Sequence, residues 1–147
     1  MKRVTIATLL ILTTLASQQA SAATYFGMFT LALTINISSA TVVPQGSSIL
    51  CTFSAETSGD SASPVNIETV SATATVSNSV ATCNLTIPYE WNLATPNSDL
   101  VTFEYSTSIV PSGGAGSAFR NGTHALLSAT GVGASGSHVS LSAETRL

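Results

Sequence analysis

The stretch FTLALTINIS, residues 29–38, alternates apolar and polar side chains without a break. In an extended strand every second side chain points to the same face, so this alternation predicts a β-strand with one buried face. The expected inward row consists of Phe29, Leu31, Leu33, Ile35 and Ile37. No later segment repeats apolar residues at helical spacing. The pattern therefore predicts a domain built from strands.

The same alternation recurs farther along the chain and extends this prediction. It is clear in residues 49–55, 81–87, 101–109 and 139–143, and weaker in residues 67–76 and 124–130. Residues that favour turns separate these segments. About seven strands arranged in this way predict an all-β fold, an antiparallel two-sheet sandwich of the immunoglobulin-like kind. A small closed barrel is the alternative.

The two cysteines, Cys51 and Cys83, fall on the apolar rows of two different predicted strands. An even number of cysteines indicates a disulfide if the chain is exported, as its first 22 residues predict. A bond between two inward rows would lie in the core, and closing this loop stabilises the fold by about 3.5–4 kcal/mol. We therefore predict a structural disulfide between Cys51 and Cys83.

The first 22 residues have the layout of a secretory signal peptide. Lys2 and Arg3 supply the positive start, residues 4–15 form an apolar run, and residues 20–22 read Ala-Ser-Ala. The apolar run is shorter than the roughly 20 residues needed to span a bilayer. We predict cleavage after Ala22, one domain over residues 23–147, no membrane span after cleavage, and export to the periplasm, cell surface or medium. An uncleaved anchor is the alternative.

Charge narrows the range of partners. Removing Lys2 and Arg3 changes the formal net charge from −3 to −5. A chain so poor in cations is not expected to bind nucleic acid or anionic membranes, both of which are recognised through Lys and Arg. His124 and His138 match no metal-ligand spacing, and we expect both to be exposed strand residues. We predict no metal site and no cofactor.

The residues show no constellation typical of catalysis. A nucleophile needs a base beside it, and glycoside hydrolysis needs two paired carboxylates. Serines are abundant, but no Gly-x-Ser-x-Gly motif precedes a predicted helix, and the acidic residues are scattered. We therefore expect a protein that is not an enzyme.

A candidate ligand site follows the second cysteine. Pro88 is expected to end the strand over residues 81–87, and an irregular stretch with aromatic residues then runs to Ser98. Exposed Tyr89 and Trp91 could stack on sugar rings, while Glu90 could accept hydrogen bonds from hydroxyl groups. The alternative is that the aromatic side chains close one end of the core, since tryptophan is usually buried.

The run from Cys83 to Trp91, Cys-Asn-Leu-Thr-Ile-Pro-Tyr-Glu-Trp, resembles a run shared by small secreted bacterial proteins of unassigned function. These proteins share a Cys-x-x-x-Ile-Pro-Tyr-x-Trp-like pattern after a β-rich half. The resemblance covers most of the chain after residue 22. It implies export and a β-rich fold, and it implies no activity.

The chain is also similar to chaperone–usher pilin subunits in its size, single disulfide and long alternating first strand. In such pilins an N-terminal extension completes the sandwich of the next subunit. The resemblance implies a pilin-like sandwich as the alternative to an immunoglobulin-like one. It also implies that residues 24–38 are a donor strand and that the inward row of residues 29–37 supplies its buried side chains. The partners would then be other copies or other surface proteins. The alternative is an ordinary first strand of a complete domain.

Overall fold

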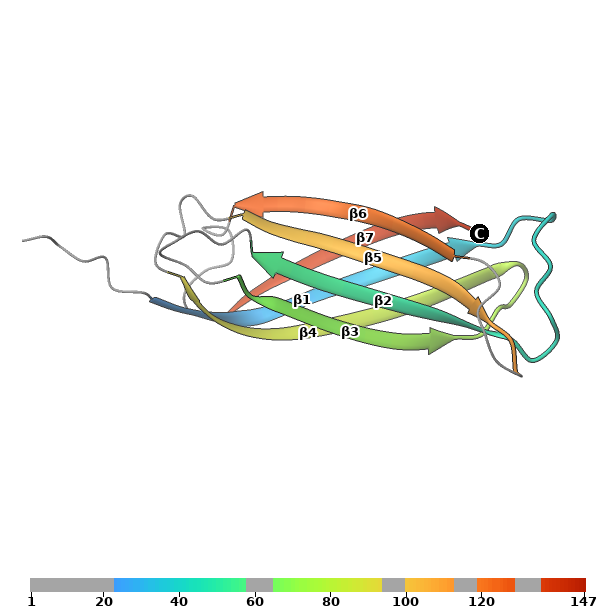
Figure 1. Ribbon diagram of the computed structural model, residues 1–147, viewed down its shortest axis with the longest axis horizontal. Coiled ribbons are helices and arrows are strands. Elements are labelled where there is room, and N and C mark those ends of the chain that lie inside the picture. Colours follow the sequence, from blue (N-terminus) through green and yellow to red (C-terminus); the bar gives the residue numbers. More distant parts are fainter. Residues whose placement is uncertain (1–22, 58–64, 94–99, 113–118, 129–135) are drawn as a thin grey trace, which may run out of the picture.

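The computed structural model describes residues 23–57, 65–93, 100–112, 119–128 and 136–147, and for residues 119–128 it describes the backbone alone. Within these ranges the chain forms two β-sheets that pack face to face, without a helix (Figure 1). The predicted all-β, sandwich-like fold is confirmed at this level. The predicted signal peptide, residues 1–22, lies outside the described residues.

The first sheet has three strands, and the first strand of the chain is its centre. Strand β1 (Ala23–Asn36) lies between β4 (Val80–Leu93) and β7 (Ser137–Arg146). It pairs with β4 in the antiparallel sense along its full 14 residues and with β7 in the parallel sense from Gly27 onward. Both edges of β1 are therefore hydrogen-bonded.

The second sheet has the order β3-β2-β5-β6, and all its neighbours are antiparallel. Its strands are β2 (Ser48–Thr57), β3 (Ile67–Ala74), β5 (Leu100–Val110) and β6 (Phe119–Ser128). The pairing of β5 with β6 shifts after Phe103, which leaves His124 of β6 as an extra residue in a bulge. The sequence placed the start of β6 at residue 124, later than the structure does.

The parallel pairing of β1 with β7 corrects the expectation of a purely antiparallel sandwich. Successive strands reverse direction at each connection, so odd-numbered strands all run the same way (Figure 1). The first and last strands are both odd-numbered, and they are neighbours in one sheet. They must therefore run parallel, although every consecutive pair of strands runs in opposite directions.

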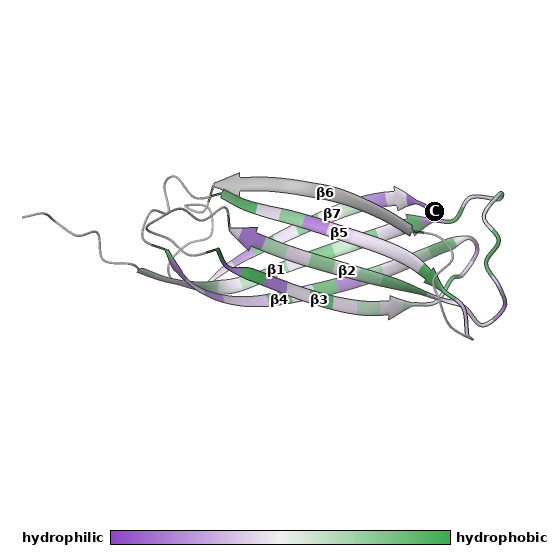
Figure 2. Ribbon diagram, viewed as in Figure 1, coloured by the Kyte–Doolittle hydropathy of each residue, from purple (hydrophilic) through white to green (hydrophobic). Residues whose placement is uncertain are grey.

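The core lies between the sheets and is formed by the alternating rows that the sequence predicted. Short hydrophobic and hydrophilic segments alternate along the strands (Figure 2). Of the predicted first row, the four residues inside β1 are at most 1% exposed, and Ile37, just beyond the strand, packs partly buried against them. The same two-residue period buries the inner faces of β2, β4 and β5. The inward rows were therefore predicted correctly.

The predicted disulfide is present and joins the two sheets. Cys51 of β2 and Cys83 of β4 are bonded, with their Cα atoms 6.5 Å apart. Both side chains are at most 2% exposed. The bond therefore fixes β4, a strand of the first sheet, to the second sheet.

The expected end of a strand at Pro88 was wrong, because β4 continues to Leu93. β4 is an edge strand of its sheet. An edge strand tolerates proline because the missing N–H can face away from the partner strand. The outward side chain of Pro88 lies opposite Met28 of β1 in the register.

Candidate functional site

The three predicted ligand-binding residues lie in strand β4 and not in a loop. They follow the alternation of that strand, so Tyr89 and Trp91 point inward while Glu90 points outward. The exposed fraction is 4% for Tyr89 and 1% for Trp91. Rings buried to this extent offer no stacking surface to a sugar. The structure places them where the alternative interpretation did, at one end of the core.

The buried rings form one aromatic cluster that crosses between the sheets. Phe29 of β1 stacks on Tyr89 with ring centroids 4.2 Å apart, and the Trp91 ring lies 5.4 Å from it. Phe103 of the second sheet meets Phe29 edge-on at 4.9 Å. Each such pair adds about 0.5–1.5 kcal/mol beyond the burial of its area. Tyr89 and Trp91 of the Pro-Tyr-x-Trp run are thus core residues.

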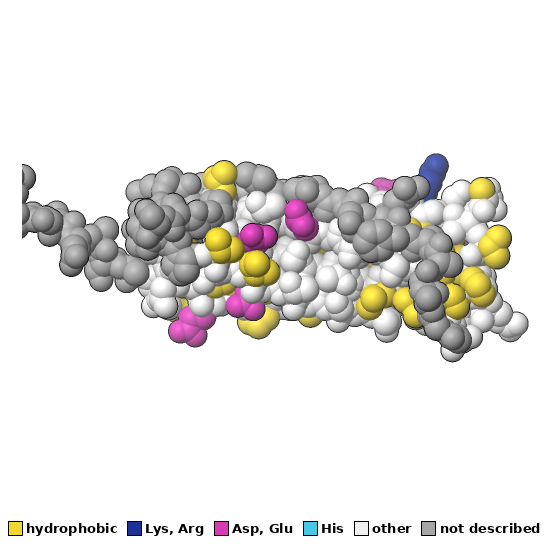
Figure 3. Space-filling model, in the orientation of Figure 1, with side chains coloured by type: hydrophobic (Ala, Val, Ile, Leu, Met, Phe, Trp, Pro, Cys, Tyr) yellow, Lys and Arg dark blue, Asp and Glu magenta, His cyan; other side chains and the backbone are white. Residues whose placement is uncertain are grey.

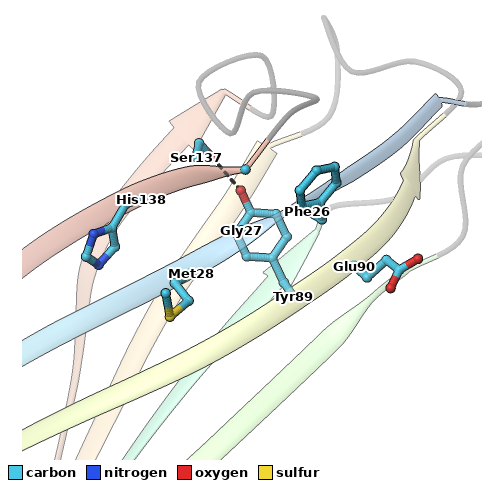
Figure 4. Close-up of a pocket in the computed structure, with 8 residues that line it drawn as sticks. Phe26, Gly27, Met28, Tyr89, Glu90, Ser137 and His138 are labelled. Atoms are coloured by element: carbon cyan, nitrogen blue, oxygen red, sulfur yellow. Dashed lines mark hydrogen bonds between the residues drawn. The ribbon is translucent and has the colours of Figure 1, made fainter.

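A glycine allows Tyr89 to reach across the sheet. Gly27 of β1 lies opposite Tyr89 of β4 and opposite Ser137 of β7. A Cβ atom at Gly27 would lie 2.0 Å from the carbonyl oxygen of Ser137 and 2.8 Å from the Tyr89 hydroxyl oxygen. The Tyr89 hydroxyl passes over this position to share a 2.5 Å hydrogen bond with the Ser137 hydroxyl (Figure 4). The close approach of β7 to β1 therefore requires glycine here.

Burial also affects the ionisation of this tyrosine. Removal from solvent raises the pKa of Tyr89 above its ordinary value, and the hydrogen bond to Ser137 lowers it in part. The phenol is therefore held neutral. A neutral phenol hydrogen-bonded to a serine is a cross-strand link between β4 and β7 that bridges the glycine of β1.

A shallow depression lies beside this link, on the outer side of the three-stranded sheet. Its volume is about 580 Å³. It is lined by Phe26, Gly27, Met28, Tyr89, Glu90, Gly136, Ser137 and His138. Phe26 and Met28 are 47% and 45% exposed, and Glu90 and His138 come from the strands on either side of β1 (Figure 4). The depression offers apolar contact between one carboxylate and one imidazole.

Other candidate groups are spread out. In the part of the chain that the structure describes, no three His, Cys, Asp or Glu side chains are close enough together to hold a metal ion. His138 is exposed on β7, as expected, and the side chain of His124 lies outside the described residues. Several acidic side chains lie on the left half of the face shown in Figure 3. Asp60 and Asp99 belong to segments that are not described.

Four of the five predicted donor-strand residues are fully buried in the first sheet, and Ile37, just beyond β1, is partly buried. Phe29, Leu31, Leu33 and Ile35 project from β1 into the core of their own chain. β4 and β7 flank β1 and are not paired with each other. The structure thus shows β1 completing its own domain, while its central position makes it the strand on which the whole sheet depends.

Sequence reasoning missed Gly27, Ser137 and the residues that line the depression. Gly27 and Ser137 are 110 positions apart and become neighbours only through the parallel pairing of β1 with β7. A glycine inside an alternating strand was the one local signal, since it often marks a close approach of another backbone.

The described residues include no helix long and apolar enough to cross a bilayer. Comparison of the chain with models of known protein families, with curated proteins and with solved structures finds no match.

Proposed function

We propose that the protein is an exported, non-enzymatic structural subunit, a pilin-like β-sandwich that assembles at the periplasmic or cell-surface side by exchanging β1 between copies. The observation that carries the proposal is the place of β1. It is the first strand of the described residues and also the centre of a sheet whose other two strands are not paired with each other.

The site that β1 occupies can accept β1 of the same chain or β1 of a neighbouring copy. β4 and β7 present their backbone edges to it along most of its length, and four of its apolar side chains fill the core. If β1 left, the edges of β4 and β7 and the core beneath would be exposed together. A neighbouring copy's β1 would make the same contacts as the chain's own, which is the energetic basis of strand exchange.

The connections of β1 also favour exchange. Residues 37–47 join it to β2, so on the predicted cleavage at Ala22 it is held to the rest of the domain at one end only. The disulfide between Cys51 and Cys83 keeps β4 attached to the second sheet without involving β1. When β1 is withdrawn, β4 therefore stays covalently attached beside the empty position of β1. The disulfide also supports an oxidising compartment.

The experiment is a cysteine trap across the pairing of β1 with β4. Thr30 and Thr86 are directly opposite on the outer face, at a Cα separation of about 4.5–5.5 Å that a disulfide can span. One secreted chain carries Thr30→Cys, a second carries Thr86→Cys with a different tag, and both are produced in the same cells. Exchange predicts covalent heterodimers on a non-reducing gel.

The matched control places the first cysteine at Thr34, whose partner on β4 is Thr82 and not Thr86. Thr34→Cys with Thr86→Cys should give no heterodimer, because the two positions are four residues out of register. If Thr30→Cys and Thr86→Cys also stay separate, while the same two substitutions in one chain form an internal disulfide, β1 remains in its own domain and the proposal fails.

A further inference from the structure

One sheet edge of this sandwich differs from the others. β7 is an edge of the first sheet and, among the described residues, pairs only with β1. Exposed strand edges attract further strands, and proteins usually block them with proline, charged side chains (above all lysine), bulges or short length. β4 contains Pro88, β6 has the bulge at His124, and β3 has only 8 residues. β7 runs for 10 residues, SHVSLSAETR, without proline, glycine or lysine, and its two charged residues, Glu144 and Arg146, lie at its C-terminal end.

The inner row of β7 is also incompletely covered. Val139, Leu141 and Ala143 pack against the core but are only partly buried, in contrast to the fully buried row of the neighbouring β1. A strand added beyond β7 would place its own inward side chains beside this row. Covering apolar area in this way removes it from water, which favours association.

We propose that β7 pairs with β7 of a second copy, antiparallel and about a two-fold axis at Leu141, to join two three-stranded sheets into one continuous sheet. Leu141 then lies opposite Leu141 of the second copy, and Val139 lies opposite its Ala143. A two-fold axis perpendicular to the sheet keeps both inner rows on the same side. This contact leaves β1 in place, so it is independent of strand exchange.

Charge selects this register. Centring on Leu141 puts His138 opposite Glu144 of the second copy, twice by symmetry, and an imidazole N–H can donate to a carboxylate in either protonation state. Centring on Ser142 would put His138 opposite Arg146 instead, whose guanidinium only donates hydrogen bonds and cannot accept one from the imidazole N–H. Shifts by one residue would place the apolar row opposite the polar row.

The acidic partner is already oriented for this contact. The side-chain amide of Asn36 donates a hydrogen bond to the Glu144 carboxylate, which holds that group on the outer face of the sheet. A carboxylate has about four acceptor sites, so this bond leaves room for a histidine N–H. Both Glu144 and His138 are exposed.

The first test is a cross-link between Ser140 and Ser142, which are exposed and opposite each other in the proposed register. The full secreted protein is made with Ser140→Cys and, separately tagged, with Ser142→Cys; the two are mixed after folding and mildly oxidised. A covalent heterodimer is expected. Ser140→Cys alone should not cross-link to itself, because the two copies of that position are diagonal, about 7–8 Å apart and beyond the usual reach of a disulfide.

The second test reverses the charge and follows the dimer by sedimentation velocity. Glu144→Lys should weaken dimerisation about tenfold, because two cross-strand pairs are lost together. Adding His138→Glu to Glu144→Lys should restore it. Glu90→Lys makes the same charge change on β4 and should leave the dimer unaffected.

The outcomes separate this interface from strand exchange. A Ser140–Ser142 cross-link without a Thr30–Thr86 cross-link supports the β7 dimer alone, and the reverse result supports exchange alone. A protein that stays monomeric at hundreds of micromolar and forms no Ser140–Ser142 cross-link overturns the β7 proposal. So does a dimer whose affinity is the same with Glu144→Lys as with Glu90→Lys.

Discussion

Replacing Gly27 with alanine should destabilise the domain, although alanine usually stabilises a strand relative to glycine. The new Cβ would lie 2.0 Å from the backbone oxygen of Ser137, and a backbone atom cannot rotate away as the end of a side chain can. Overpacking of this kind costs about 1–3 kcal/mol. Separating β7 from β1 would also break the bond between Tyr89 and Ser137, worth about 1 kcal/mol. The gain from removing a glycine is about 0.5–1 kcal/mol. The expected net loss in the free energy of unfolding is therefore about 1–3.5 kcal/mol.

Urea unfolding followed by tryptophan fluorescence measures this loss directly. Trp91 is the sole tryptophan of the chain and is 1% exposed, so its emission reports the opening of the core. Gly46→Ala is the control: Gly46 has φ +79°, but an added Cβ would meet nothing closer than 3.6 Å. The Gly46→Ala protein should lose about 1–2 kcal/mol in the free energy of unfolding, from backbone conformation alone. A Gly27→Ala protein as stable as the parent would refute the close approach of β7 to β1.

Three further changes test the core and its link to β7. Replacing Cys51 and Cys83 together with alanine should lower the free energy of unfolding by about 3–4 kcal/mol in a urea titration, since the bond closes a loop of 32 residues' separation. Leu33→Ala should cost about 2–5 kcal/mol at a fully buried site, whereas Thr34→Ala on the outer face should cost less than about 0.5 kcal/mol; equal effects would contradict the assigned faces of β1. Because the pKa of Tyr89 is raised in the folded state, its contribution to the free energy of unfolding is complete below pH 10.0. This contribution is lost as the pH rises from 10.0 to the folded pKa, since the tyrosine of the unfolded chain ionises at the lower pH. Tyr89→Phe should flatten this alkaline loss, and an unchanged slope would argue against a buried phenol.

The sequence was sufficient for the features that depend on local pattern. The period of two identified which side chains of β1, β2, β4 and β5 face the core, because a strand points alternate residues to opposite faces wherever it lies in a sheet. The disulfide followed from the same rows, since Cys51 and Cys83 each occupy an inward position. Both predictions rest on a property of each strand taken alone.

The tertiary structure decided which strands are neighbours. Alternation makes one face apolar but does not specify the partner across a sheet edge, so the central place of β1 and its parallel pairing with β7 had no local signal. The same reason explains the candidate site. The sequence predicted a strand end at Pro88, but β4 is an edge strand that tolerates the proline and continues to Leu93. Tyr89 and Trp91 therefore lie in the core and not in an exposed loop. Gly27 acquired its role only when Ser137, 110 positions away, was brought against it.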